Sequence, residues 1–230
     1  MLLLPFGTKS HYITNSPAKP KASQLKSINS LEQLAQVYGD AVPAALWKEI
    51  DYINDHYRQF IEKSPFLVLA TIGENGLDCS PRGDPAGFVR VVNEKCIQLP
   101  DRRGNNRLDS IKNIIRNPSV GLIFLVPNAG ETIRLSGKAE ILVDDDLCRS
   151  FAINGKAASS VLSISVDKVY FQCQKAIARS KLWDTSEHID RSELPTAGQM
   201  VKGFAVENNQ EFNSDSYDKN YPARMKETIY

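Results

Sequence analysis

The sequence has few of the residues that build zinc, disulfide or nucleophilic centres. Four cysteines and three histidines are spread over 230 residues. No C-x-x-C pair occurs, and no histidine lies near a cysteine in a zinc-type spacing. His11, His56 and His188 fall in an arm, a helix and a tail, which disfavours a Ser/His/Asp assembly. We therefore expect reduced thiols, as in a cytosolic protein, and no metal site.

Charge excess, long apolar runs and common nucleotide loops are also missing. The formal net charge of +1 gives no overall attraction to nucleic acid or anionic membranes. No apolar run approaches the ~18 residues of a membrane span, and the initial MLLLPF is too short for a signal-peptide core. Neither G-x-x-x-x-G-K-[ST] nor a G-x-G-x-x-G between strand and helix occurs. We expect a cytoplasmic protein whose anion sites are local clusters of cations.

Composition divides the chain into three parts. Residues 1–26 are rich in Pro, Lys and Ser, which is typical of a mobile arm, and residues 186–230 form a polar tail that we expect to be irregular. Residues 27–185 are expected to form a single domain. Ser30 and Gln33 predict a capping box and a short helix through Val37. Apolar residues at helical spacing predict one further helix from Pro43 to Phe60.

Strand patterns dominate the domain after Pro65. Asn75-Gly76 predicts a tight turn between strands at 66–72 and 77–82, and a second hairpin joins 87–92 to 96–100. Further strands are predicted at 120–127, 131–142 and 161–173. Short helices are predicted from the start at Arg107 to Asn117, at 144–152 and after 173. Short turns between strands indicate an antiparallel sheet, and closure into a barrel removes exposed edges. The fold class is mainly β, of α+β type.

The stretch LPDRRGNNRLDSIKNIIRNP, residues 99–118, runs from a strand through a basic loop into a helix. Unpaired N–H groups at a helix start favour an anion, and Asn105, Asn106 and Arg107 are suited to bind a phosphate there. Arg90 projects from a nearby strand and is a second candidate cation. Solvated arginines without a ligand are the alternative, particularly for Arg102 and Arg103. Asp144, Asp145 and Asp146 are better explained by a helix start than by a cation.

The order of four segments resembles the pyridoxamine 5'-phosphate oxidase-related, FMN-binding split-barrel family. The segments are FLVLATIGENG, LDCSPRGDPAGFVRVV, IQLPDRRGNNRLDSIKNIIRNPSVGLIFLVP and ETIRLSGKAEIL, which together cover about residues 60–145. The later CQKAIARSKLW resembles a feature of an uncharacterised subgroup. The resemblance implies a six-stranded antiparallel split barrel that forms a homodimer, with FMN bound at the subunit interface.

The resemblance also implies the residues that bind the cofactor. By position, Arg90 and the triplet Asn105, Asn106 and Arg107 match the residues that hold the FMN phosphate. Ser80 and Arg82 match a segment beside the flavin ring, whereas Asp101 and Thr132 match polar cofactor contacts. Arg179, Ser180 and Trp183 are expected near the cofactor of the same or the other subunit, with interface packing as the alternative for Trp183.

The implied activity is hydride transfer between flavin N5 and an unknown small-molecule substrate. The tail lacks the Trp and R-L-H-like cluster of pyridoxamine phosphate oxidases proper, so vitamin B6 synthesis is not expected. Two alternatives are a flavin-binding, stress-related module without turnover and a related barrel that binds deazaflavin or haem. Nucleic-acid binding is not expected, because no aromatic residues interleave with the basic loop.

Overall fold

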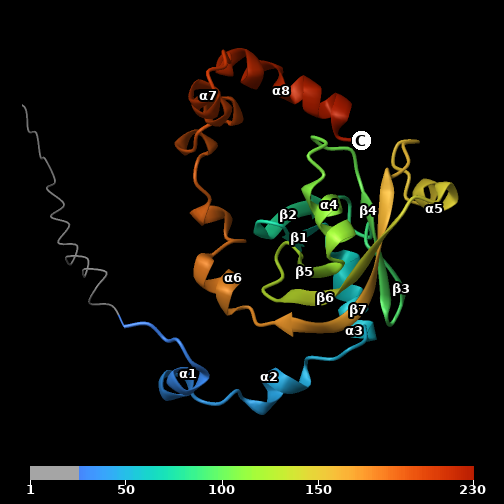
Figure 1. Cartoon of the computed structure of the whole chain (residues 1–230), viewed down its shortest axis with the longest axis vertical. Coiled ribbons are helices and arrows are strands. Elements are labelled where there is room, and N and C mark those ends of the chain that lie inside the picture. Colours follow the sequence, from blue (N-terminus) through green and yellow to red (C-terminus); the bar gives the residue numbers. More distant parts are fainter. Residues whose placement is uncertain (1–25) are drawn as a thin grey trace, which may run out of the picture. The chain divides into compact units, whose positions relative to one another are not determined.

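The computed structural model describes residues 26–230 (Figure 1), so the arm expected at residues 1–26 lies almost wholly outside the described residues. The chain divides into two units, Met1–Val42 and Pro43–Tyr230. In the first, helix α1 (Leu31–Val37) begins as predicted at Ser30, whose Oγ accepts from the N–H of Gln33 at 3.2 Å. The Gln33 side chain accepts from the N–H of Asn29 rather than from the cap itself.

The second unit begins with two short helices instead of the single helix predicted from Pro43 to Phe60. These are α2 (Pro43–Trp47) and α3 (Asp55–Lys63). Between them, the N–H and C=O of Ile50 bond to the backbone of Val169 at 3.0 and 2.7 Å. Asn54 then caps α3 by accepting from the N–H of Tyr57 at 2.9 Å. The prediction of one helix was wrong because a backbone pairing with a distant strand interrupts the helical spacing.

The centre of this unit is one antiparallel sheet of seven strands in the order β2-β1-β5-β6-β7-β4-β3. The strands are β1 (Phe66–Gly73), β2 (Gly76–Gly83), β3 (Arg90–Asn93), β4 (Cys96–Asp101), β5 (Ser119–Leu125), β6 (Thr132–Leu142) and β7 (Ser160–Gln172). The turn predicted at Asn75-Gly76 is confirmed, with Gly76 at a φ of 107°. The residue patterns had indicated each of the seven segments.

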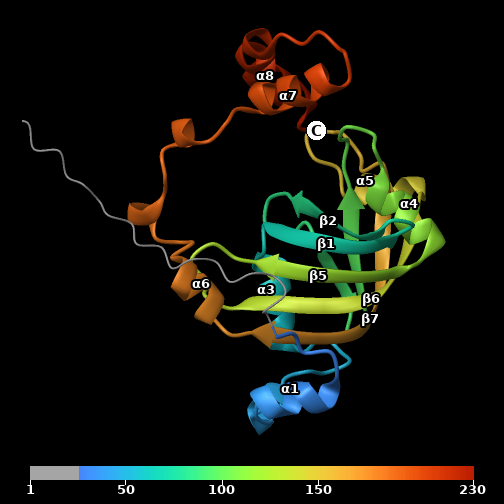
Figure 2. The same cartoon turned by 60° about the vertical axis from the view of Figure 1, so that its left-hand side comes forward.

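The sheet curves strongly, as Figure 2 shows for β1, β5, β6 and β7. Its two edge strands, β2 and β3, are consecutive in the chain. Residues 84–89 connect them and lead from one edge of the sheet to the other. Pro85 and Gly87, whose φ is 91°, lie in this link. The split barrel implied by the resemblance is therefore confirmed, but the implied count of six strands is wrong because this link separates β2 from β3.

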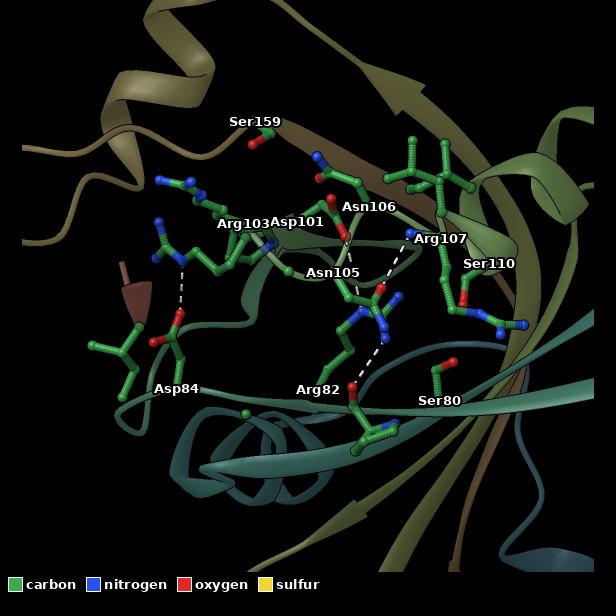
Figure 3. A pocket seen from close by; sticks show the side chains of 18 of the residues that line it. Ser80, Arg82, Asp84, Asp101, Arg103, Asn105, Asn106, Arg107, Ser110 and Ser159 are labelled. Carbon is green, nitrogen blue, oxygen red and sulfur yellow. Dashed lines mark hydrogen bonds and ion pairs between the residues drawn. The ribbon is translucent and has the colours of Figure 1, made fainter. Parts of the chain in front are cut away.

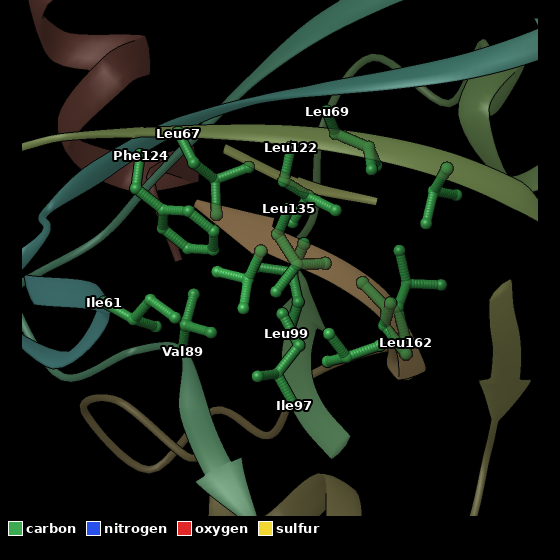
Figure 4. Packing of buried hydrophobic residues seen from close by; sticks show 14 of the residues in the cluster. Ile61, Leu67, Leu69, Val89, Ile97, Leu99, Leu122, Phe124, Leu135 and Leu162 are labelled. Atoms are coloured by element: carbon green, nitrogen blue, oxygen red, sulfur yellow. The ribbon is translucent and has the colours of Figure 1, made fainter. Parts of the chain in front are cut away.

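Alternate residues of the curved sheet fill its interior (Figure 4). Leu67 and Leu69 on β1, Ile97 and Leu99 on β4, and Phe124 on β5 are almost completely buried in one cluster. Ile61 of α3 belongs to the same cluster, so this helix completes the core.

At Gly137 of β6, where the pairing with β7 shifts, an added Cβ would lie 2.0 Å from the backbone oxygen of Ser165. Close strand approach therefore requires glycine there.

Two helices between the strands begin and end close to their predicted positions. Helix α4 (Asp109–Arg116) ends at Asn117 and is tied to the barrel by Asn113, whose Nδ2 donates to Thr71 Oγ1 at 3.0 Å. Helix α5 (Asp145–Ser150) begins at Asp144, whose carboxylate accepts from the N–H of Leu147 at 2.8 Å. The acidic run is thus a helix start, and the described residues contain no group of acids, cysteines and histidines suited to a metal ion.

The C-terminal part contains regular helices where an irregular tail was expected. After α6 (Lys175–Ser180) and two single 3-10 turns, Thr185–Glu187 and Arg191–Glu193, the chain forms α7 (Ala197–Glu207) and α8 (Ser214–Thr228). A capping box of Thr196 and Gln199 begins α7, and Asp218 of α8 accepts from the N–H of Gly198 at 2.8 Å. Polar caps and this pairing stabilise helices that lack a strong apolar pattern. Across residues 26–230, none of the helices has the length and apolar character needed to cross a membrane.

Candidate functional site

A cavity of about 980 Å³ lies where β2 and β4 end and α4 begins (Figure 3). Three stretches form most of its wall: residues 80–85 after the middle of β2, residues 100–111 from the end of β4 into α4, and Ile229–Tyr230. Phe88 and Ser159 complete it. The curvature of the barrel brings β2 and β4 together although they are not neighbours in the sheet order.

Pairs of arginine and aspartate side chains line this cavity. Arg102 Nε lies 2.8 Å from Asp84 Oδ2, in a pair whose side chains are only 17% and 3% exposed. Arg82 Nε lies 4.0 Å from Asp101 Oδ1. Arg103 also lines the cavity, and within residues 26–230 it forms no ion pair. The cavity wall carries four arginines, Arg103 among them, and three aspartates.

Asp101 has the most perturbed carboxyl group of the cavity wall. Burial raises the pKa of Asp101 above its ordinary value, because desolvation disfavours the ionised form. The guanidinium of Arg82 acts in the opposite direction but does not cancel the effect. A carboxylate that is costly to ionise is well placed to gain from a hydrogen-bond donor supplied by a ligand.

The loop that leads into α4 has an unusual backbone. Asn106 and Leu108 adopt left-handed conformations, with φ values of 57° and 58°. Asparagine tolerates this conformation, but for leucine it is uncommon and costs free energy. Leu108 occupies the cap position of α4 and has no side-chain oxygen for the first-turn N–H groups. The start of α4 therefore presents backbone donors and the positive end of the helix dipole without a side-chain cap.

Ser110 adds a buried donor at the same place. It is the second residue of α4, lines the cavity and is only 3% exposed. Among the described residues it is the one whose buried side-chain oxygen has no hydrogen-bond partner. A buried hydroxyl without a partner costs about 1–3 kcal/mol, which makes Ser110 a candidate to pair with a ligand or an ordered water at the cavity wall.

Six of the predicted site residues meet at this cavity. Ser80, Arg82, Asp101, Asn105, Asn106 and Arg107 all line it, as Figure 3 shows. The side chain of Arg107 is 74% exposed, and its Nε pairs with Asp109 Oδ2 at 2.8 Å. Asp109 raises the pKa of Arg107 through this hydrogen bond. Helix α4 begins two residues after Arg107, at Asp109, so Arg107 belongs to the loop.

Arg90 does not line this cavity, so the described chain does not place it with Asn105, Asn106 and Arg107, with which it was expected to hold a phosphate. Its guanidinium lies 4.0 Å from the ring centroid of Phe151 and 3.3 Å from Ser150 Oγ. Val89 and Val91 point into the core, so the alternation of the strand places Arg90 on the outer face. There the segment after α5 supplies a stacking partner for the guanidinium, a contact that the spacing of β3 and β4 does not reveal.

Four other candidates lie outside the cavity of their own chain. Thr132 is buried at the start of β6, where it pairs with Gln172. Arg179 and Ser180 are exposed on α6, and Trp183 Nε1 donates to the backbone oxygen of Ala129 at 2.8 Å. None of the four lines the cavity formed by the described residues. Their predicted contacts with a cofactor therefore stay predictions.

Sequence reasoning missed several cavity residues. Ser110 and Asp84 stand in stretches that were considered, LDS and RGDP, but their burial depends on the fold. For Arg102 and Arg103 the sequence allows either a phosphate cluster or a solvated rim, and both residues line the cavity. Tyr230 had no sequence signal, because its place follows from α8.

Comparison with protein families assigns the fold to a known group. Residues 53–173 match the family described as pyridoxamine 5'-phosphate oxidase, which is more than half of the chain. The chain belongs to this family. The match includes the whole barrel and the segments of the cavity wall between β2 and α4.

Solved structures with a similar barrel are more distant. HupZ from Group A Streptococcus is 16% identical, covering 51% of this chain and 91% of its own, with a TM-score of 0.42. A putative pyridoxamine 5'-phosphate oxidase from Lactobacillus delbrueckii is 18% identical, covering 53% and 95%, with a TM-score of 0.42. General stress protein 26 from Bacillus anthracis is 17% identical, covering 49% and 88%, with a TM-score of 0.39. No curated protein matches the sequence. The family assignment therefore rests on the sequence match alone.

Proposed function

We propose that this protein binds FMN in the cavity between β2, β4 and α4 and transfers hydride between the flavin and a small-molecule substrate in the cytoplasm. The observation that carries the proposal is the unpaired, buried hydroxyl of Ser110 at the uncapped start of α4. It supports an anionic ligand at this point of a barrel whose family is described as pyridoxamine 5'-phosphate oxidase.

The cavity fits a phosphorylated flavin in size and in donor chemistry. Its volume of about 980 Å³ lies at the upper end of cofactor sites. The first-turn N–H groups of α4, Ser110 Oγ and the guanidinium of Arg107 are the donors that a phosphate dianion needs. Asn105 and Asn106 add amide groups on the same loop. We assign the phosphate to this end of the cavity.

The remaining wall is suited to the polar part of a flavin. Ser80 and Arg82 of β2 lie across the cavity from the loop, with Arg82 close to Asp101. A bound FMN would supply the hydride-accepting chemistry, while the protein supplies position and charge. Arg82 would donate hydrogen bonds to ring or ribityl oxygens, and Asp101 would accept hydrogen bonds from ribityl hydroxyl groups. Such a donor would offset part of the cost of keeping Asp101 ionised.

The proposal includes a homodimer. Arg179, Ser180 and Trp183 are held on and after α6, away from the cavity of their own chain. We propose that these residues approach the flavin of the partner subunit, so that each site is completed by two copies. Gel filtration with light scattering tests this, because a monomer that binds FMN with full affinity contradicts it.

The visible spectrum of the purified protein is the first test of the function. The proposal expects two flavin bands, either on purification or after FMN is added to the colourless protein. A Soret band would indicate haem, and a single band at shorter wavelength would indicate deazaflavin. Anaerobic mixing with reduced nicotinamide cofactors then separates an oxidoreductase, whose flavin bleaches, from a binding module, whose flavin does not. Absence of any flavin binding would refute the proposal.

A further inference from the structure

Tyr230 reaches the cavity from a part of the chain outside the barrel. It follows α8 and lies against the cavity at Asp84, which Figure 3 shows at the other end from Ser110. Its Oη donates to Asp84 Oδ1 at 2.8 Å. Its ring centroid lies 5.9 Å from the guanidinium carbon of Arg102. The backbone oxygen of Tyr230 accepts from Lys156 Nζ at 2.5 Å.

Tyr230 contacts a buried ion pair of the cavity wall, formed by Asp84 and Arg102. Asp84 receives both Arg102 Nε through Oδ2 and Tyr230 Oη through Oδ1, so both carboxylate oxygens are engaged. Arg102 also donates to the backbone oxygen of Phe151 at 2.7 Å. The hydrogen bond to Asp84 raises the pKa of Tyr230, which keeps the phenol protonated and able to donate. Tyr230 is therefore held at three points on three different segments of the barrel.

Tyr230 also stands between two hollows. A smaller hollow of about 240 Å³ is lined by Arg102, Arg103, Lys156, Ala157, Ser159 and Tyr230. Arg102, Arg103, Ser159 and Tyr230 line the larger cavity as well. The tyrosine thus belongs to the wall that the two hollows share. The size and charge of the Asp84 end depend on where this one side chain lies.

We propose that Tyr230 is a positioning residue that closes the Asp84 end of the cofactor cavity, limiting solvent access to the bound flavin and slowing its release. This inference rests on the proposed function for the identity of the ligand. It goes beyond that function because it gives α8 a role at a site that the barrel segments otherwise form. Displacement of Tyr230 breaks its bond to Asp84 and opens the wall to the smaller hollow.

The closed position is tested first without any flavin. The full chain is labelled with 3-fluorotyrosine, and the ¹⁹F resonance of Tyr230 is assigned by its loss in Tyr230→Phe. A direct contact predicts that Asp84→Asn shifts this resonance, whereas Lys138→Gln, which changes an exposed lysine bonded to Ser119, leaves it in place. A Tyr230 resonance at the position of a mobile tyrosine and insensitive to Asp84→Asn would overturn the proposal.

Flavin release and flavin exposure test the consequence. Loss of one hydrogen bond to a charged group predicts about tenfold faster FMN release in Tyr230→Phe, and a larger increase in Tyr230→Ala. Iodide should quench the bound flavin more efficiently in both variants. Tyr221→Phe makes the same chemical change on α8 outside the cavity and should leave both values unchanged. Equal release and quenching in all proteins would refute closure, whereas failure of every protein to bind FMN would refute the proposed function and leave the ¹⁹F result to decide the position of Tyr230.

Discussion

Replacing Ser110 by alanine should change protein stability and ligand affinity in opposite directions. In the ligand-free protein its hydroxyl is buried and unpaired, at a cost of about 1–3 kcal/mol. Alanine removes the oxygen and leaves only a small space, so we expect the free energy of unfolding to rise by up to about 1 kcal/mol. The same substitution removes a donor to the phosphate. A hydrogen bond to a charged group contributes about 1.5–3 kcal/mol, which corresponds to about 10- to 150-fold weaker FMN binding.

Ser64→Ala is the matched control for this experiment. Ser64 is as buried as Ser110, but its Oγ lies 2.7 Å from the backbone oxygens of both Phe66 and Leu125. Its replacement should lower the free energy of unfolding by about 1–3 kcal/mol and leave FMN affinity unchanged. Urea denaturation of the ligand-free proteins and fluorescence titration with FMN give the two quantities. A Ser110→Ala protein that is destabilised like Ser64→Ala and binds FMN normally would refute our assignment.

Three further outcomes follow from particular contacts. The raised pKa of Asp101 means that the folded state holds its proton more tightly than the unfolded state. The stability of the wild type relative to Asp101→Asn should therefore fall as the pH rises above the unfolded-state pKa of about 4, which urea denaturation measures. Arg90→Ala should leave FMN affinity unchanged and lower the free energy of unfolding by about 0.5–1 kcal/mol, because its contact with Phe151 is lost. A large loss of FMN affinity would show instead that Arg90 contributes to the binding site. Gly137→Ala should lower the free energy of unfolding by about 1–3 kcal/mol or prevent folding, because its Cβ would meet a β7 carbonyl at 2.0 Å.

Turn residues and strand patterns in the sequence were sufficient to predict the strands of the sheet. Asn75-Gly76 predicted its turn because a positive φ is needed there, and the alternation in β7 predicted a strand. The prediction of a single helix after Pro43 was wrong because the backbone of Ile50 pairs with that of Val169, which lies far along the chain. The prediction of an irregular tail was wrong because α7 and α8 are stabilised by helix caps and by contact with each other rather than by an apolar stripe.

Site residues that are neighbours in the sequence could be predicted, whereas those brought to the site by contacts between distant segments could not. The loop around Asn105, Asn106 and Arg107 carries its chemistry in consecutive residues, and the structure places it at the cavity. Arg90 was misplaced because its partner, Phe151, lies on a segment after α5. Ser110 and Tyr230 were missed because their importance comes from a missing partner and from a distant helix end.

Comparison of FMN with riboflavin tests the central claim most directly, because the two ligands differ only in the phosphate. If the start of α4 and Ser110 bind that phosphate, the purified ligand-free protein should bind FMN at least about 100-fold more tightly than riboflavin, in line with two or more charge-assisted hydrogen bonds. In Ser110→Ala this preference should shrink. Equal affinity for the two flavins, or binding of neither, would contradict the account.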